Sequence, residues 1–335
     1  MIIDNCSYST QNLVNIRSVR KVEGALESFA ILIPTRNRPK ELSILIRSIQ
    51  KSTLLPKQVV VIASGQNVAS ILDEFSKSLE ITYLHTELMG QIAQKRLGVE
   101  LVSKEVDWCL FLDDDLILDE FAIDRALSAA NSYKKKDIIG IGLSLPPLSR
   151  ALNVSNVNKK LLEFLKLSSK YSGQVLRSGH APSYLQETAV IETQWLNGAS
   201  MWKTVHAKNY GIDLPSTPYA ACEDLIFSYP LGKQATLIYV PDAKLRFQDS
   251  QLSDFDSLEV FRAASYWRYY FIFNHKELSF VWFYVSQLAR TLYAIRKAKV
   301  KRLGLSRELL KLNFKLVRSH FSGVSPNVLL NELNH

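Results

Sequence analysis

Three consecutive carboxylates at the end of a short apolar run constrain the fold of this chain more than any other feature. The run extends from Trp108 to Leu112 and stops at Asp113, Asp114 and Asp115. Its length and composition predict a buried strand, so the acids should lie beyond the carboxyl end of that strand. In open α/β sheets, ligands bind in the crevice outside these strand ends. Adjacent carboxylates repel one another, and a divalent cation that bridges to phosphates would offset this repulsion.

A structural interpretation of the three acids is also open. A helix is predicted over Asp119–Ala130, directly after the acids. Helix N-termini favour acidic side chains, because the unpaired N–H groups there carry partial positive charge. The acids alone therefore leave two hypotheses, metal–phosphate chemistry and helix capping.

The surrounding sequence alternates between apolar runs and helical patterns. Between the runs, apolar residues recur at helical spacing, as in Leu42, Leu45, Ile46 and Ile49. Alternation of this kind favours right-handed βαβ units, and hence an α/β fold in which helices flank a central sheet. Further strands are predicted at Phe29–Ile33, Gln58–Ala63, Ile81–Leu84, Ile138–Leu143, Thr193–Trp202 and Ala235–Phe247.

Composition and motif positions predict three segments. The chain has 335 residues, of which 47% are hydrophobic and 22% charged, as expected of an ordered globular protein. Residues 1–27 are polar and irregular and are interpreted as a leader, residues 28–250 as the α/β domain, and residues 251–335 as a helical, basic extension. No secretion signal is recognisable at the N-terminus, and three scattered cysteines favour a reduced, cytoplasmic location.

The positive charge is concentrated near the C-terminus. Between Arg290 and His320 there are ten Lys or Arg residues and one acid, Glu308, which accounts for the net charge of +9. The apolar segment Leu278–Leu288 before it has eleven residues, fewer than the roughly 20 that span a bilayer. Two interpretations follow. The helices make peripheral contact with the inner face of the plasma membrane, or they pack on the catalytic region with a solvated basic face.

Seven motifs occur in order over roughly Phe29–Phe247. They are PTRNRP after the first strand, Ser64-Gly65, GQIAQKRLG, FLDDD, NGASM, CED and YVPDA. Their order resembles that of family 2 glycosyltransferases of the GT-A fold. The resemblance implies a Rossmann-like nucleotide-binding mixed sheet flanked by helices, and the transfer of a sugar from a nucleotide-sugar donor to a hydroxyl acceptor. Bacterial surface polysaccharide assembly is the implied setting, with a saccharide or lipid-linked saccharide as acceptor.

The resemblance also implies roles for individual residues. Asp224 of the Glu223-Asp224 pair would be the catalytic base, and Asp115 would bind Mg²⁺ or Mn²⁺. Asp113 or Asp114 would hold the metal or the donor ribose. The implied donor-binding residues are Pro34, Thr35, Arg36, Asn37, Arg38, Ser64, Lys95, Arg96, Asp113, Asp114, Asn197 and Gly198.

This chain departs from the family pattern in two places. Many members carry acids after the second strand that contact the nucleobase, whereas this chain has Ala63-Ser64-Gly65. The preference for a particular base is therefore open. Many members also carry a His after the last motif strand, where this chain has Gln248-Asp249. Either residue is a candidate to replace that His.

The chemistry of sugar transfer is consistent with these residue types. A metal ion and the cationic side chains of Lys95 or Arg96 would neutralise the leaving diphosphate. One carboxylate within hydrogen-bond reach suffices to accept the proton of the attacking hydroxyl, and direct displacement predicts inversion at the anomeric carbon.

Two other classes of function are weighed against this one. A nucleotidyltransferase would use a similar sheet, but such enzymes usually have a glycine-rich first loop, and Pro34–Pro39 contains no glycine. A nucleic-acid-binding protein would use the basic tail. Nucleic acid is not expected as a partner, because the aromatic residues gather in apolar runs rather than among the charges.

Overall fold

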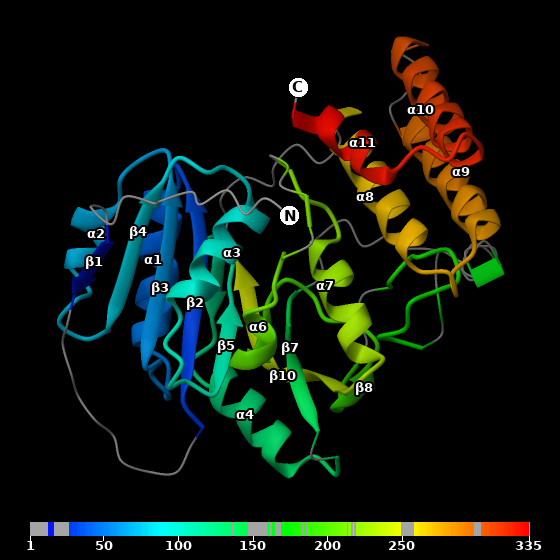
Figure 1. The fold of residues 1–335 in the computed structure, drawn as a ribbon. Coiled ribbons are helices and arrows are strands. Elements are labelled where there is room, and N and C mark those ends of the chain that lie inside the picture. The colour runs from blue at the N-terminus through cyan, green and yellow to red at the C-terminus, as the bar shows by residue number, and fades with distance from the viewer. Residues whose placement is uncertain are drawn as a thin grey trace, which may run out of the picture.

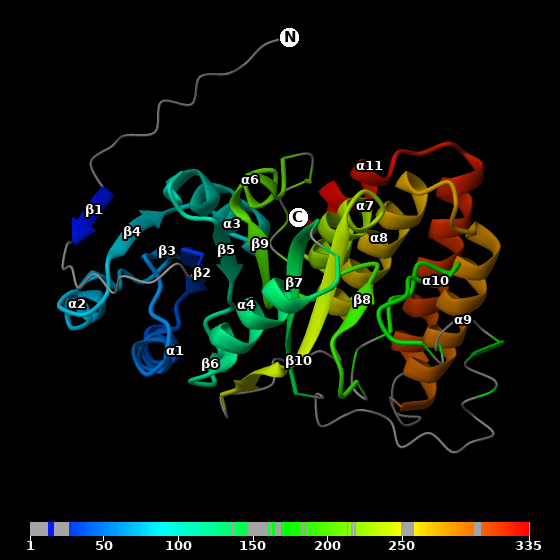
Figure 2. The ribbon, with the colours of Figure 1, turned by 90° about the horizontal axis from the view of Figure 1, so that it is seen from below.

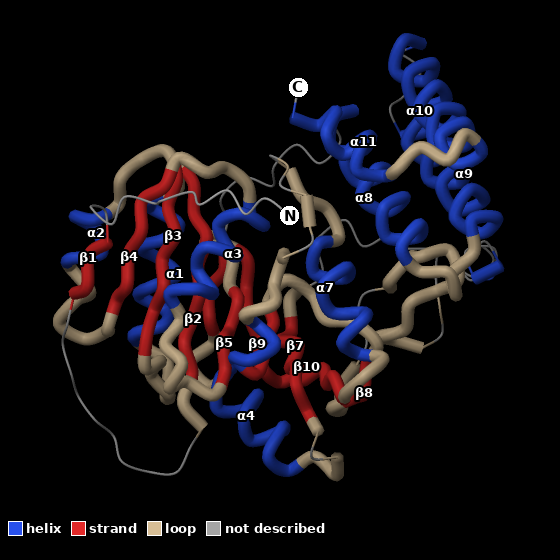
Figure 3. Tube along the Cα trace, viewed as in Figure 1, coloured by secondary structure: helices blue, strands red, loops and turns tan. Residues whose placement is uncertain are grey.

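The computed structural model places a large sheet beside a group of C-terminal helices (Figure 1). Figure 3 shows the strands side by side, with helices on both faces of the sheet. The structure describes residues 13–16, 27–135, 137–146, 171–182, 187–212, 219–248, 258–297 and 303–334, with a few single positions between these ranges.

One half of the sheet consists of parallel strands joined by helices. Its strands lie in the order β4-β3-β2-β5, and each pair of neighbours is parallel. Helices cover both faces, so the strands are apolar almost throughout, and β3 is buried along its whole length. The elements are β2 (Phe29–Arg36), α1 (Pro39–Gln50), β3 (Gln58–Ser64), α2 (Ala69–Asp73), β4 (Ile81–Thr86), α3 (Gln91–Leu101) and β5 (Trp108–Phe111).

The other half of the sheet is mixed. Strand β9 lies between β5 and β7 and runs antiparallel to both, while β10 runs parallel to β7. Strand β10 is one continuous strand of 12 residues, and its end pairs with β6. The predicted α/β fold around a mixed sheet is confirmed. The elements are β6 (Leu116–Leu118), α4 (Ala122–Ser132), β7 (Ile138–Ser144), β8 (Ile191–Thr193), β9 (Ser200–Lys203), α6 (Thr204–Ala207), α7 (Glu223–Gly232) and β10 (Thr236–Phe247).

The segment interpreted as a leader contributes a strand that the sequence analysis did not predict. Strand β1 (Leu13–Ile16) pairs antiparallel with β4 at the edge of the sheet. Four residues within a polar surrounding give too weak a pattern to be recognised as a strand without the neighbour that pairs with them.

Close contact between α3 and β2 fixes the position of the helix that faces the acids. A side chain at Gly98 would place its Cβ 2.6 Å from Leu32 Cδ1 and 3.1 Å from Ile62 Cγ1. Only glycine therefore lets the helix approach the sheet this closely. We expect Gly98→Val to lower the free energy of unfolding by about 1–3 kcal/mol through overpacking. Urea denaturation measures this, with Glu100→Val on the exposed face of the same helix as the control for helix propensity.

The C-terminal helices form a second core that packs against α7. Trp267, Tyr269 and Phe283 are fully buried there, together with Leu225 and Tyr229 of α7. Figure 2 shows α8 between α7 and the outermost pair, α9 and α10. Among the described residues, no helix is both long and apolar enough to cross a bilayer. The elements are α8 (Leu258–Asn274), α9 (Phe280–Lys297), α10 (Leu303–Phe321), α11 (Pro326–Asn331) and a 3₁₀ turn, η2 (Glu332–Asn334).

Candidate active site

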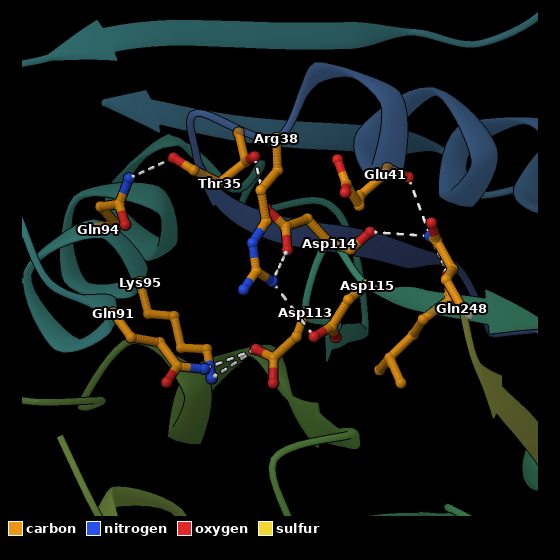
Figure 4. Close-up of polar contacts among 11 residues, drawn as sticks. Thr35, Arg38, Glu41, Gln91, Gln94, Lys95, Asp113, Asp114, Asp115 and Gln248 are labelled. Atoms are coloured by element: carbon orange, nitrogen blue, oxygen red, sulfur yellow. Dashed lines mark hydrogen bonds and ion pairs between the residues drawn. The ribbon is translucent and has the colours of Figure 1, made fainter. Parts of the chain in front are cut away.

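The three acids lie just after the end of β5, where Asp114 and Asp115 share the partner Arg38 and Asp113 faces Gln91 and Lys95 (Figure 4). Asp114 is buried and accepts hydrogen bonds from Thr35 Oγ1 at 2.6 Å and from Arg38 Nη1 at 3.1 Å. Burial raises the pKa of Asp114 to about 6, although both hydrogen bonds favour its charged form. Asp114 therefore holds the first loop against the strand end, and its oxygens are already engaged.

Asp113 and Asp115 remain open to solvent. Asp115 pairs with Arg38 at 3.2 Å, and Asp113 Oδ1 accepts a hydrogen bond from Gln91 Nε2 at 2.5 Å. Their side chains are 42% and 35% exposed, so their carboxylates can still meet a ligand. The three acids line a pocket of about 360 Å³, whose other walls are Pro34, Thr35, Arg36, Arg38, Gln91 and Gln94.

Asn37 stabilises the conformation of the loop after β2. This residue has a positive φ of 56°, and its Oδ1 accepts a hydrogen bond from the N–H of Gln66 at 2.8 Å. Gly65 also has a positive φ, and a Cβ there would lie 2.2 Å from Asn37 Oδ1. Ser64 is buried beside Gln94 Nε2 at 3.3 Å. Asn37 and Ser64 thus join the ends of β2 and β3, and neither lines the pocket.

Lys95 connects the acids after β5 with the acids of α7. Its side chain is 1% exposed, and its Nζ lies 3.6 Å from Asp113 Oδ1 and 3.9 Å from Glu223 Oε1. The rings of Phe111 and Tyr210 lie within 6 Å of the same nitrogen. A buried cation with carboxylates on two sides places the two acidic motifs at one site, as the resemblance implies.

Arg96 does not join this group. Its side chain is exposed, and its Cβ lies near Gly211 rather than at the acids. Consecutive residues on a helix are turned by about 100°, so Lys95 and Arg96 cannot both face the pocket. Arg96 as a donor-binding residue stays a prediction without a contact to support it.

The Glu223-Asp224 pair lies at the start of α7, where the chain enters the helix through Cys222 with a positive φ of 64°. Burial and the charge of Asp224 raise the pKa of Glu223 to about 8, against the effect of Lys95. Burial also raises the pKa of Asp224 to about 6, opposed by the 2.7 Å hydrogen bond from the N–H of Leu225. Burial raises the pKa of Glu223 further than that of Asp224, so Asp224 is the more readily ionised of the two and the better candidate for the base.

The loop before β9 lies beside Asp113. A Cβ at Gly198 would be 3.8 Å from Asp113 Oδ2, so the small residue leaves this side of the carboxylate open. Asn197 Nδ2 donates to the carbonyl of Leu143 at 3.0 Å, whereas its buried Oδ1 has no hydrogen-bond partner among the residues that the structure describes. An unpaired buried acceptor costs free energy. Asn197 is thus suited to accept a hydrogen bond from a bound ligand.

Two carboxylates are available for a metal ion. Among the residues that the structure describes, no group of three His, Cys, Asp or Glu side chains could hold one. Asp113 and Asp115 nevertheless fit an ion of the magnesium type, which is commonly bound by one or two carboxylates and completed by phosphates and water.

Gln248, one of the two candidates to replace the family's His, donates hydrogen bonds to the backbone. Its Nε2 donates to the carbonyl oxygens of Glu41, Asp114 and Leu116 at 3.0–3.1 Å, and its N–H donates to that of Asp115 at 2.8 Å. These bonds anchor the acidic turn to α1 and β10. The other candidate at this place, Asp249, lies outside the described residues.

The sequence analysis missed Gln91, Gln94 and Tyr210. Gln91, Gln94 and Lys95 occur at helical spacing and share one face of α3, which was the signal available in the sequence. Gln94 Nε2 donates to the carbonyl oxygens of Thr35 and Ile62 at 2.9 and 3.2 Å. Nothing in the sequence places Tyr210 at this site. Its neighbour Lys95 lies more than 100 residues earlier in the chain, and its neighbour Phe111 lies nearly 100 residues earlier.

Comparisons with known proteins agree with this geometry. Residues 30–151, which include the first loop, Lys95 and the three acids, match the family described as Glycosyl transferase family 2. Over this part, the chain is similar to family 2 glycosyltransferases. No curated protein sequence matches it significantly.

The fold of the chain is similar to that of TarS from S. aureus. Residues 1–349 of TarS in complex with UDP-GlcNAc superpose with a TM-score of 0.55 at 15% sequence identity, covering 89% of this chain and 84% of TarS 1–349. The complex with UDP gives a TM-score of 0.53 at 16% identity, covering 89% and 83% of the two chains. The similarity in fold thus extends beyond residues 30–151, which the sequence family matches.

Proposed function

We propose that this glycosyltransferase moves a sugar from a nucleotide-sugar donor to a hydroxyl acceptor, with inversion at the anomeric carbon. The proposal rests on the position of Lys95 between Asp113 and Glu223. This position brings the pocket proposed for the donor diphosphate next to the buried acids of α7. The TarS structures with UDP-GlcNAc and UDP support a donor of this class. The setting we favour is bacterial surface polysaccharide assembly, with a saccharide or lipid-linked saccharide as acceptor.

The donor diphosphate would lie in the pocket bounded by Asp113 and Asp115. Asp113 and Asp115 would hold Mg²⁺ or Mn²⁺, and the bound ion supplies positive charge to the leaving diphosphate. Arg36 lines the same pocket and can donate hydrogen bonds to phosphate oxygens. Asn197 and Gly198 leave room beside Asp113 for the donor sugar.

Asp224 would accept the proton of the acceptor hydroxyl as its oxygen bonds to the anomeric carbon. The bond from that carbon to the diphosphate oxygen breaks with its electron pair on the diphosphate, and the proton ends on the Asp224 carboxylate. Lys95 stabilises the charged form of Asp224 and so keeps this base ionised near neutral pH. One base acting directly predicts inversion.

Metal dependence is tested with nucleotides before any acceptor is known. A ligand that binds the folded chain raises its melting temperature by mass action. We expect one nucleoside diphosphate to raise it more than the others, and only with Mn²⁺ or Mg²⁺ present. Asp115→Asn should abolish the metal-dependent part of the shift. An unchanged shift in that variant would contradict the assignment of Asp115 as a metal ligand.

A product assay separates this function from nucleotidyl transfer. A glycosyltransferase releases a nucleoside diphosphate from the nucleotide sugar, whereas a nucleotidyltransferase forms or consumes pyrophosphate. We expect nucleoside diphosphate and no pyrophosphate.

A further inference from the structure

Helix α9 presents an apolar stripe to solvent. Val281, Leu288 and Leu292 are 70%, 47% and 55% exposed, and their spacing of seven and four residues places them on one face of the helix. The opposite face is packed, with Phe283 and Thr291 fully buried. The exposed stripe is therefore a consequence of the sequence pattern and not of a loosely packed helix.

Helix α10 carries a second stripe with the same spacing. Leu310, Phe314 and Phe321 are 49%, 70% and 82% exposed, while Leu312 and Leu316 are buried. Seven of the nineteen large apolar side chains that are exposed in the described chain lie on α9 and α10. Scattered apolar residues are ordinary on a protein surface, but stripes of this kind mark an interaction surface.

Unpaired arginines accompany both stripes. Arg296 follows the α9 stripe by four residues, and Arg307 and Arg318 flank the α10 stripe. All three are exposed, and none forms an ion pair with an acid in the described part of the chain. Lys311 pairs with Glu308, the one acid of the segment. The apolar stripes thus lie within a strongly positive surface.

We propose that the exposed faces of α9 and α10 dock on an anionic lipid bilayer, with the apolar side chains at the level of the headgroups and the arginines against lipid phosphates. Amphipathic helices with this combination of residues lie in the membrane interface, and neither of these helices is able to span it. The proposal is independent of the donor and acceptor, because these helices lie beyond α8, at the end of the molecule opposite β1 (Figures 1 and 2).

The charge of the surface favours lipid over a second copy of the chain. A symmetric dimer brings the same patch of each copy together, so arginines would face arginines and repel one another. An anionic bilayer offers complementary charge to every arginine at once. The apolar side chains gain burial in either case, so the charges decide between the two.

Co-sedimentation of the full chain with lipid vesicles tests the proposal. We expect binding to vesicles of phosphatidylglycerol and phosphatidylcholine, weak binding to phosphatidylcholine alone, and loss of binding as salt is raised. Leu292→Glu with Phe314→Glu should reduce the partition coefficient about tenfold or more, and Arg296→Gln with Arg318→Gln should reduce it by a similar factor. Val205→Glu is the matched control, because Val205 is 69% exposed on α6 of the catalytic domain.

Each outcome decides the proposal. Unchanged melting temperature and nucleoside diphosphate binding would show that the variants fold, so a loss of vesicle binding would then support membrane docking. Equal binding to both vesicle types, or binding that the helix variants do not alter, would overturn it. A wild-type dimer that Phe314→Glu converts to a monomer, without vesicle binding, would assign the surface to self-association instead.

Discussion

Replacing Asp224 by Asn is expected to lower the rate of sugar transfer by about 10²- to 10⁴-fold, the usual contribution of a general base. An amide cannot accept the proton of the attacking hydroxyl, although it has nearly the same shape as the carboxylate. Donor binding should remain, because the donor pocket is lined by other residues. The measurement is the steady-state rate of nucleoside diphosphate release in the presence of acceptor.

Two further variants and the pH profile sharpen this test. Asp242→Asn on the exposed part of β10 should keep the wild-type rate. Glu223→Gln should cost less than Asp224→Asn, because a carboxyl with a pKa of about 8 is already protonated at pH 7. Since the base acts in its ionised form, the rate should fall as the pH falls through about 6, the pKa of Asp224. A larger loss in Glu223→Gln would transfer the role of base to Glu223.

Replacing Lys95 by Met is expected to reduce transfer at pH 7 about tenfold or more through the protonation of the base. Lys95 is the cation that favours the charged forms of both Glu223 and Asp224. Without it, the pKa of each acid rises further, and the acid limb of the rate profile moves to higher pH. The pH profile of the rate is therefore the diagnostic measurement, because a purely structural role would lower the rate equally at every pH.

Lys95→Arg and the exposed neighbour Arg96 provide the controls. Lys95→Arg retains the charge and should restore much of the profile, provided that circular dichroism shows the larger side chain is accommodated. Arg96→Met removes a cation from the same helix, one residue away, and should leave the profile unchanged. If Lys95→Met has the wild-type profile, Lys95 does not set the charge state of the base.

The strand ends were predictable from the sequence because apolar runs and their boundaries are local signals. Trp108–Leu112 and the acids after it indicated both the strand β5 and the place where it ends. The antiparallel insertion of β9 between β5 and β7 was not predictable, because no local pattern states which strands will be neighbours.

The different contacts of the three acids could also be established only from the structure. Three adjacent Asp residues look equivalent in sequence. In the structure, however, buried Asp114 accepts hydrogen bonds from Thr35 and Arg38, while the other two acids face solvent. Arg38 therefore pairs with acids instead of standing free for a phosphate. The contact between Lys95 and Glu223 joins residues separated by 128 positions, and no periodicity spans such a distance.

The attachment of the acidic turn by Gln248 affects how the enzyme can respond to its donor. Four hydrogen bonds from this one residue reach the backbone of α1, of the turn and of β6, so the turn cannot move without breaking several of them. We therefore expect the turn that carries Asp113, Asp114 and Asp115 to keep the same conformation with and without a bound donor. Adaptation to donors of different size would then fall to Arg38, whose side chain is 42% exposed and would have to leave its ion pairs with Asp114 and Asp115 to move.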